Sequence, residues 1–256
     1  MSGILVERLE EGRIARLSLS AGKGNVLTKA LNGELARAFD ALGEDRRLRA
    51  IVLTAEGKDF SFGASVPEHA PGQVEQMLPA FHALFRSIAR SALPVVAAVR
   101  GRCLGGGFEL ALAAHRIFVT PDAKLGVPEV TLGVFPPVAA ALLPLRVPQP
   151  VVDRMVGLGE IVDGSLAVQL GLADTLVEAP EALESEALDW ARRTLDLSGA
   201  AVRFATRAAR AAWDEALGSR LAQLEALYLN ELMETADARE GIAAFIERRK
   251  PRWVDA

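Results

Sequence analysis

The stretch Gly101-Arg-Cys-Leu-Gly-Gly-Gly-Phe-Glu-Leu-Ala111 is the most informative part of this chain. It follows an apolar, valine-rich run at 94–99 and leads into an alanine- and leucine-rich run at 108–114. This order predicts a buried strand, a glycine turn and then a buried helix. Because glycine has no Cβ, a ligand atom can approach the main chain closely at such a turn, where the first N–H groups of the helix point outward.

The predicted turn suits an oxygen atom that carries or acquires negative charge, because the helix dipole adds positive charge to the free amides. Glu109 lies three residues after Gly106, about one turn into the helix and beside the same pocket. A carboxylate next to an oxyanion site suggests proton transfer at a carbonyl compound. The alternative is that the glycines only allow tight helix packing and that Glu109 is solvated. The stretch is neither GxGxxG nor a P-loop, which disfavours those two kinds of phosphate binding.

Strand, loop and helix patterns alternate along the first part of the chain. A β-hairpin is predicted at 4–9 and 14–19, and Thr28 is placed to cap the helix that follows. A strand at 49–54, a glycine loop at Gly63, a helix at 73–91 and the strand at 94–99 come next. We therefore expect an α/β fold with parallel crossovers, in which ligands bind at the carboxyl ends of the strands.

The elements then become shorter and finally almost all helical. Strands or extended segments are predicted at 116–120, 123–129 and 172–177, with short helices at 136–145, 151–158 and 163–170. Longer helices follow at 181–197, 200–217, 220–235 and 238–249. We divide the chain into a core at 1–195, which holds the site, and a helical region at 196–256. Because many apolar residues of that region need a partner surface, it is interpreted as a packing or oligomerisation element.

The composition is that of an ordinary globular protein. The net charge of −4 and the scattered Lys and Arg give no reason to expect nucleic-acid binding. The N-terminal segment lacks a signal or transit pattern, and no apolar run is long enough to span a membrane. The single cysteine, Cys103, excludes an internal disulfide and is interpreted as a buried thiol in a reducing, cytoplasmic location. The three histidines, His69, His82 and His115, lack metal-ligand spacing, so no metal is expected.

Three segments, in this order and spacing, resemble the enoyl-CoA hydratase/isomerase (crotonase) superfamily over nearly the whole chain. Phe60-Ser-Phe-Gly-Ala-Ser65 is similar to the family's Phe-x-x-Gly-Ala-Asp, and Gly101–Ala111 to Gly-x-x-x-Gly-Gly-Gly-x-Glu-Leu-Ala. Leu125-Gly-Val-Pro-Glu129, with Leu132-Gly-Val-Phe-Pro136, is similar to Phe-Gly-x-Pro-Glu…Gly-x-x-Pro. The resemblance implies a crotonase-like spiral of ββα repeats with a helical C-terminal trimerisation region, assembled as homotrimers or homohexamers.

The resemblance also implies the chemistry of the site. The amide groups of Ala64 and Gly106 would form an oxyanion hole for the carbonyl of an acyl-CoA thioester, with no metal or redox cofactor. Glu109 and Glu129 match the two catalytic glutamates of the hydratases. Two facing carboxyl groups can hold a water molecule, take a proton from it and supply a proton to carbon.

Coenzyme A contacts follow from the same resemblance. The turn that contains Lys23, Asn25 and Val26 lies where the family's main chain meets the adenine and pantetheine. Phe245 and Arg248 match a C-terminal Phe-x-x-Lys pattern that contacts CoA, often from a neighbouring subunit. Arg248 keeps the charge of the lysine that it replaces, but the exchange is not neutral at a tight site. The alternative for Arg248 is a solvated helix charge.

Two departures from the family pattern narrow the range of acyl groups that we expect the chain to accept. Ser65 stands where many relatives have aspartate, and residues 135–140 replace a loop that is usually glycine-rich. The loops look most like those of hydratases that act on cyclohexa-1,5-diene-1-carbonyl-CoA in anaerobic aromatic degradation. Phe62 and Phe135 would then line a flat, apolar ring pocket, with core packing as the alternative for each.

Other functions stay open at this point. A general short-chain enoyl-CoA hydratase has the same parts, and an isomerase would shift a double bond with one glutamate as proton shuttle. A ring-opening hydrolase is a further enzymatic alternative, and a non-catalytic acyl-CoA-binding scaffold is the alternative outside enzymes. The presence of both Glu109 and Glu129 favours hydration.

Overall fold

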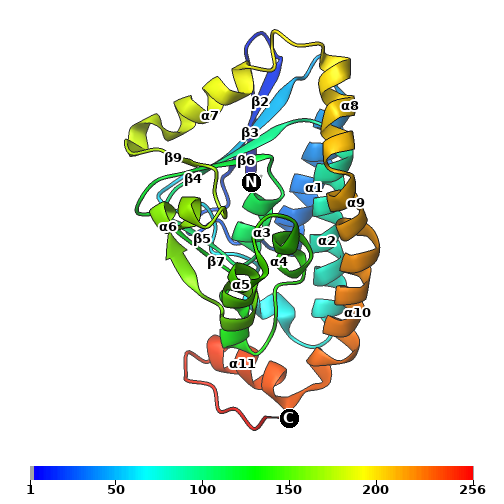
Figure 1. The fold of residues 1–256 in the computed structure, drawn as a ribbon. Helices are drawn as coiled ribbons and strands as arrows, with labels where there is room; N and C mark the ends of the chain where they lie inside the picture. The colour runs from blue at the N-terminus through cyan, green and yellow to red at the C-terminus, as the bar shows by residue number, and fades with distance from the viewer. Residues whose placement is uncertain (1–2, 256) are drawn as a thin grey trace.

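The computed structural model describes residues 3–255 and has two β-sheets at its centre (Figure 1). The larger sheet has the strand order β1-β2-β3-β4-β6-β9. The hairpin β1–β2 is antiparallel, and each later neighbour in this sheet is added in parallel. Its strands are β1 (Ile4–Leu9), β2 (Ile14–Leu19), β3 (Ala50–Ala55), β4 (Val95–Val99), β6 (Arg116–Val119) and β9 (Thr175–Leu176).

Helices cover both faces of this sheet, which explains why β3 and β4 are apolar at almost every position. One face packs on α7 (Leu183–Arg192), through a cluster that includes Val52, Val96 and Leu183. The other face packs on α1 (Lys29–Glu44), α2 (Val74–Ser91) and α3 (Gly106–Leu112), on the opposite side of the sheet from α7 (Figure 1). The hydroxyl of Thr28 accepts a hydrogen bond from the amide of Leu31, as predicted for the cap of α1.

A second, three-stranded sheet carries the glycine-rich stretch. It consists of β5 (Arg102–Leu104), β7 (Lys124–Gly126) and β8 (Ile161–Asp163). The sequence analysis missed β5 and β8, because three-residue strands are too short to show a period. It also placed the helix at 108–114, whereas α3 spans Gly106–Leu112. The backbone of Gly106 and Gly107 is already helical, so the turn is confined to Gly105 with its φ of +52°.

Short helices and turns lie before, between and after the strands of the small sheet. These are α4 (Pro137–Leu142), α5 (Gln149–Val152), α6 (Gly164–Gln169) and the single-turn 3₁₀ helices η1 (Val66–His69) and η2 (Pro128–Leu132). Asp163 caps α6 by accepting a hydrogen bond from the amide of Leu166. The predicted short helices and the extended segment at 123–129 are thus confirmed in type, with bounds that differ by a few residues.

The C-terminal region is helical, as predicted. It contains α8 (Gly199–Ala209), α9 (Ala211–Glu215), α10 (Leu221–Asn230) and α11 (Ala236–Ile246). In Figure 1, α8, α9 and α10 form a column beside α1 and α2, and α10 packs on both α2 and α4. Leu221 and Tyr228 of α10 belong to the same buried cluster as the core helices. The division at residue 195 falls between α7 and α8 and stays a prediction.

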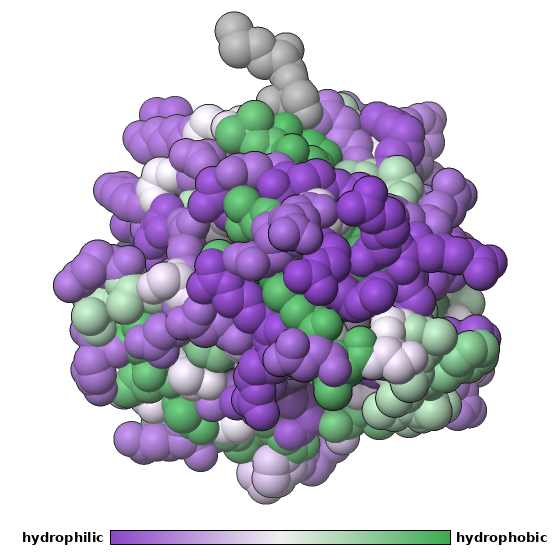
Figure 2. All heavy atoms as spheres, turned by 90° about the horizontal axis from the view of Figure 1, so that it is seen from above, coloured by the Kyte–Doolittle hydropathy of each residue, from purple (hydrophilic) through white to green (hydrophobic). Residues whose placement is uncertain are grey.

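The surface carries a few exposed apolar side chains on the helical region. Phe204 of α8 is 69% exposed and Leu197 is 56% exposed. The face seen in Figure 2 is mostly hydrophilic, and apolar residues occur there in small groups. Within residues 3–255, every helix is too short or too polar to cross a bilayer.

Candidate active site

Strand pairing brings three loops to one edge of the small sheet. Leu104 at the end of β5 pairs with Gly126 at the end of β7, and the Gly105 amide donates to the Gly126 carbonyl at 2.8 Å. The segment that begins at Phe60 lies beside β5, because the Leu104 amide donates to the Ser61 carbonyl at 3.0 Å. The carboxyl ends of parallel strands lie at one edge of a sheet, so Ala64, α3 and η2 meet there.

The amide groups of Ala64 and Gly106 lie next to each other at this edge. A Cβ built on Gly106 would lie 3.1 Å from the Ala64 nitrogen, and one built on Gly63 would lie 3.2 Å from the Gly106 nitrogen. Neither amide donates a hydrogen bond to another residue of the described chain. Two free donors that share one opening can bind a single oxygen atom.

At Gly105 and at Gly107 a side chain is excluded for different geometric reasons. At Gly107, a Cβ would lie 2.6 Å from the Ser61 Cβ, so a side chain would push α3 away from the neighbouring segment. At Gly105, a Cβ would lie 2.8 Å from Oε1 of Glu129, in a left-handed backbone conformation. Gly107 therefore allows tight packing of α3, as one of the two interpretations of the sequence proposed, and Gly105 leaves room for the Glu129 carboxyl group.

Glu109 is buried at the start of α3, with only 2% of its surface exposed. Its Oε1 accepts a hydrogen bond of 2.8 Å from the Ala139 amide near the start of α4. Burial raises the pKa of Glu109 to about 7, and the amides of Ala139 and Val138 oppose that rise. The alternative of a solvated Glu109 is therefore wrong, because the carboxyl group lies inside the protein.

Glu129 follows β7 in the turn η2, and its carboxyl group points into the protein, as that of Glu109 does. Its Oε2 is buried and forms no hydrogen bond with any described residue. Burial, and then the charge of Glu109, raise the pKa of Glu129 well above its usual range. Because each negative charge disfavours the other, the pair keeps a proton near neutral pH. A pair of this kind can supply one carboxylate and one carboxylic acid.

The predicted CoA turn lies beside Phe62. Nδ2 of Asn25 donates to the carbonyls of Glu56, Asp59 and Phe60, at 3.1, 3.2 and 3.2 Å. The Asn25 side chain therefore holds the turn together, while Lys23 is exposed and Val26 half-buried.

Phe62 itself lies against the CoA turn. Its ring covers Gly24, where a Cβ would lie 2.5 Å from the ring, and the Arg102 guanidinium lies 5.1 Å from the ring centroid. Of the two predicted ring-pocket residues, Phe62 thus packs on the turn that is predicted to meet CoA.

Phe135, the second predicted ring-pocket residue, packs against helix α10. Its ring centroid is 5.3 Å from that of Tyr228, whose side chain is buried. Sequence analysis did not select Tyr228, because it stands alone in a helical pattern with no motif around it.

Phe245 and Arg248 lie at the end of α11 and just beyond it, and both are exposed. No hydrogen bond joins the Arg248 side chain to the rest of the described chain, so both side chains are open to a ligand or a second subunit.

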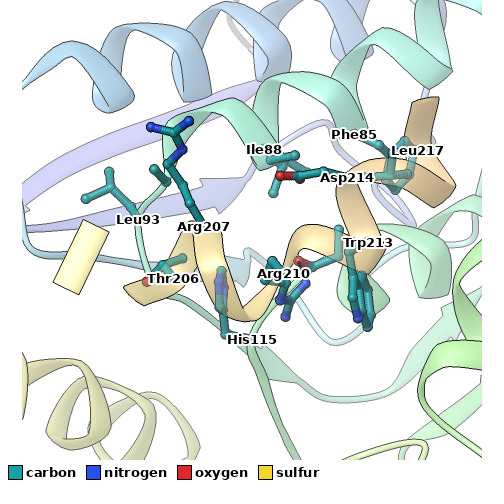
Figure 3. Close-up of a pocket in the computed structure, with 13 residues that line it drawn as sticks. Phe85, Ile88, Leu93, His115, Thr206, Arg207, Arg210, Trp213, Asp214 and Leu217 are labelled. Carbon is teal, nitrogen blue, oxygen red and sulfur yellow. Dashed lines mark hydrogen bonds between the residues drawn. The ribbon is translucent and has the colours of Figure 1, made fainter. Parts of the chain in front are cut away.

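Figure 3 shows a different pocket, between α2 and the helices α8 and α9. Phe85, Ile88 and Leu217 give it apolar walls, and no residue of the predicted site lines it. The Arg210 guanidinium donates to the carbonyls of Ala113 and Ala114 at 3.1 and 2.5 Å, which fixes the end of α3. This pocket therefore belongs to the packing of the helical region.

The described residues contain no cluster of three or more His, Cys, Asp or Glu side chains placed to hold a metal ion. Burial lowers the pKa of His82 to about 4 and that of His115 to about 3. Burial likewise raises the pKa of the Cys103 thiol. These groups are therefore neutral and lie in the interior.

Comparison with known proteins covers almost the whole chain. A family model described as enoyl-CoA hydratase/isomerase matches residues 10–256. A cyclohexa-1,5-dienecarbonyl-CoA hydratase from Thauera aromatica is 44% identical over 247 residues, which are 95% of this chain and 93% of that protein. A probable enoyl-CoA hydratase from Bacillus subtilis is 32% identical, over 94% of this chain and 95% of its own.

Solved structures agree with the fold. An enoyl-CoA hydratase/isomerase from Pseudoalteromonas atlantica superposes with a TM-score of 0.88 at 26% identity, over 98% of this chain and 100% of that chain. An enoyl-CoA hydratase from Mycobacterium avium subsp. paratuberculosis gives a TM-score of 0.87 at 24% identity, over the full length of both chains. The predicted crotonase-like fold with a helical C-terminal region is confirmed.

Proposed function

Because this chain belongs to the enoyl-CoA hydratase/isomerase family, we propose that it hydrates a cyclic conjugated thioester, cyclohexa-1,5-diene-1-carbonyl-CoA. Family membership makes it an enzyme of the enoyl-CoA hydratase type, a carbon–oxygen lyase that acts on acyl-CoA. The identity of the acyl group, a cyclic diene, is the part of the proposal that goes beyond family membership. The 44% identity to the Thauera aromatica hydratase supports it, because the other relatives named above are less similar.

The buried pair Glu109 and Glu129 carries the proposal of a hydration. In the reaction, water oxygen bonds to the β-carbon of the ring, and one of its protons passes to the carboxylate of the pair. The electron pair of the diene moves through the conjugated system, and the carboxylic acid gives its proton to the far end of the diene. One double bond remains, and it joins the two middle carbons of the former diene, which lie between the β-carbon and the far end. The two glutamates thus regain the proton that they give, and the net reaction is the addition of one water molecule.

In this proposal the thioester oxygen accepts hydrogen bonds from the amides of Ala64 and Gly106. Negative charge grows on that oxygen as water attacks, so donors that are already aimed at it stabilise the transition state more than the substrate. An optimally placed donor of this kind changes the rate by on the order of 10²- to 10³-fold. Neither amide has to leave another partner first, because neither has one in the described chain.

Apolar rings beside the carboxyl pair support a flat acyl group. Phe135 lies six residues after Glu129, and its ring packs on the ring of Tyr228. Two aromatic side chains next to buried acids suit a six-membered unsaturated ring, which offers flat, apolar faces. We propose Phe135 as one wall of the acyl pocket and assign Phe62 to the CoA side.

We also retain the proposed CoA contacts and assembly. The main chain around Lys23, Asn25 and Val26 would meet the adenine and pantetheine, and Phe245 and Arg248 would contact CoA from the same or a neighbouring subunit. Exposed apolar residues on α8 and the segment before it, such as Phe204, favour a homotrimer or homohexamer that covers them. The reaction as proposed needs no metal or redox cofactor, and a cytoplasmic location stays an expectation.

The test compares two thioesters, crotonyl-CoA and cyclohexa-1,5-diene-1-carbonyl-CoA, with the wild-type enzyme and with Glu109→Gln and Glu129→Gln. We expect the mass of one water to be gained on the cyclic diene. Each glutamine variant should lose about 10²- to 10⁴-fold in rate, since it cannot transfer the proton. Rapid hydration of crotonyl-CoA alone would instead make the chain a general enoyl-CoA hydratase. A double-bond shift without mass gain would make it an isomerase. Bound thioester without any reaction would leave only a binding role.

A further inference from the structure

Tyr228 is a buried polar residue that the proposed reaction has not used. It lies on α10, it is the only tyrosine of the chain, and its side chain is 1% exposed. Its hydroxyl group forms no hydrogen bond with another described residue. A buried hydroxyl without a partner destabilises the fold, so such a group in a site calls for a ligand that completes its hydrogen bonds.

Packing holds the phenol ring beside the elements that carry the two glutamates. The rings of Tyr228 and Phe135 are 5.3 Å apart at an interplanar angle of 60°. Phe135 belongs to the segment between η2, which carries Glu129, and α4, whose Ala139 amide binds Glu109. The helix α10 packs on α4, which keeps the Tyr228 ring next to these segments.

A hydrogen bond fixes α10 one turn earlier. The Nδ1 atom of His82 on α2 lies 2.5 Å from Oε2 of Glu225, three residues before Tyr228. His82 is fully buried, and its low pKa keeps the ring neutral, so Nδ1–H donates to the carboxylate. Residues three apart lie on the same side of a helix, so this contact sets the rotation of α10 and with it the direction of Tyr228.

The hydroxyl interacts with both glutamates through their charges. Burial, then the charge of Glu129 and then that of Glu109 raise the pKa of Tyr228, so the phenol keeps its proton. Oε2 of Glu129 is the second buried polar atom here without a hydrogen-bond partner. The Tyr228 hydroxyl and Oε2 of Glu129 are thus two buried polar groups without partners, in the part of the core that also holds the Glu109 carboxyl. A water molecule, with two donors and two acceptors, matches this set of groups.

We propose that Tyr228 is a third residue of the hydration site and that its hydroxyl binds the water molecule that is added to the thioester. This inference rests on the proposed function. The water gives one hydrogen bond to a carboxylate and the other to the oxygen of Tyr228, which leaves a lone pair free to face the β-carbon. The phenol forms and breaks no covalent bond, and its own proton is free to bond Oε2 of Glu129.

The first test is Tyr228→Phe, which removes the hydroxyl and keeps the ring that packs on Phe135. We expect kcat to fall by about tenfold, the worth of one hydrogen bond to the reacting water, with KM nearly unchanged. The melting temperature should not fall, because the hydroxyl has no partner in the fold. The control is Phe135→Leu, which changes the ring surface and should act mainly on KM. A Tyr228→Phe enzyme with the kcat of the wild type would overturn the proposal.

A spectroscopic test uses the fact that the chain has one tyrosine. Enzyme grown with 3-fluorotyrosine should give one ¹⁹F resonance, which reports on this site alone. We expect the resonance to move as Glu109 titrates near pH 7, and the movement to disappear in Glu109→Gln. A resonance that ignores the pH in this range would overturn the proposal. If the wild type hydrates neither thioester, the proposed function fails by itself, and a moving resonance still supports Tyr228 as part of the site.

Discussion

Gly106→Ala should block the proposed oxyanion site while leaving the fold in place. The added methyl carbon would lie 3.1 Å from the Ala64 nitrogen, close to the distance at which an oxygen accepts a hydrogen bond. It would therefore crowd the space beside the Ala64 amide, where the thioester oxygen is proposed to bind. The variant keeps both amides, but an oxygen kept out of the site loses their hydrogen bonds, and the loss of one such bond costs about 10²- to 10³-fold in kcat, or roughly 3–4 kcal/mol of transition-state stabilisation.

The effect on stability should be much smaller. The same methyl would lie 2.9 Å from Cζ of Phe81, which is the far end of a side chain. Gly106 does not have a left-handed backbone, so alanine fits its conformation. We expect an overpacking penalty of about 1 kcal/mol, partly offset by the better helix propensity of alanine.

The assay measures kcat and KM on the preferred thioester together with the melting temperature. Gly218→Ala is the matched control, because a Cβ there meets no atom within 4 Å and the backbone is again not left-handed. It should keep wild-type activity and stability. Near-wild-type turnover by Gly106→Ala, in a protein that binds the thioester normally, would refute the placement of the carbonyl between the two amides.

Two further predictions concern the helical region. Because burial depresses the pKa of His82 from 6.5 to about 4, the unfolded chain takes up a proton before the folded one does, so stability should be complete above pH 6.5 and fall as the pH drops towards 4. His82→Gln should flatten this part of a denaturation-versus-pH series, and an unchanged slope would contradict the assignment. Arg210→Met should lower the free energy of unfolding by about 2–3 kcal/mol, because two buried carbonyls lose a charged donor. Urea denaturation measures this loss, with the exposed Arg207→Met as control, and equal stability of the two variants would argue against the role of Arg210.

The sequence alone determined the features that depend on neighbouring residues. The hairpin 4–19, the Thr28 cap and the helix at 73–91 agree with the structure, because local hydrophobic period and capping chemistry decide them. The glycine-rich stretch and its family resemblance also single out Glu109 and Glu129. In the structure both carboxyl groups are buried, and they lie close enough for the charge of Glu109 to raise the pKa of Glu129.

Only the tertiary structure decided the features that depend on contacts between distant segments. The strands β5 and β8 are too short to have a pattern of their own and exist because β7 pairs with both. The burial that shifts the pKa of the two glutamates comes from elements that approach them in space. Tyr228 lies 99 residues after Glu129, and no local sequence pattern links the two. The packing of α10 on α4 joins them, because side-chain contacts across a core are set by the whole fold and not by adjacent residues.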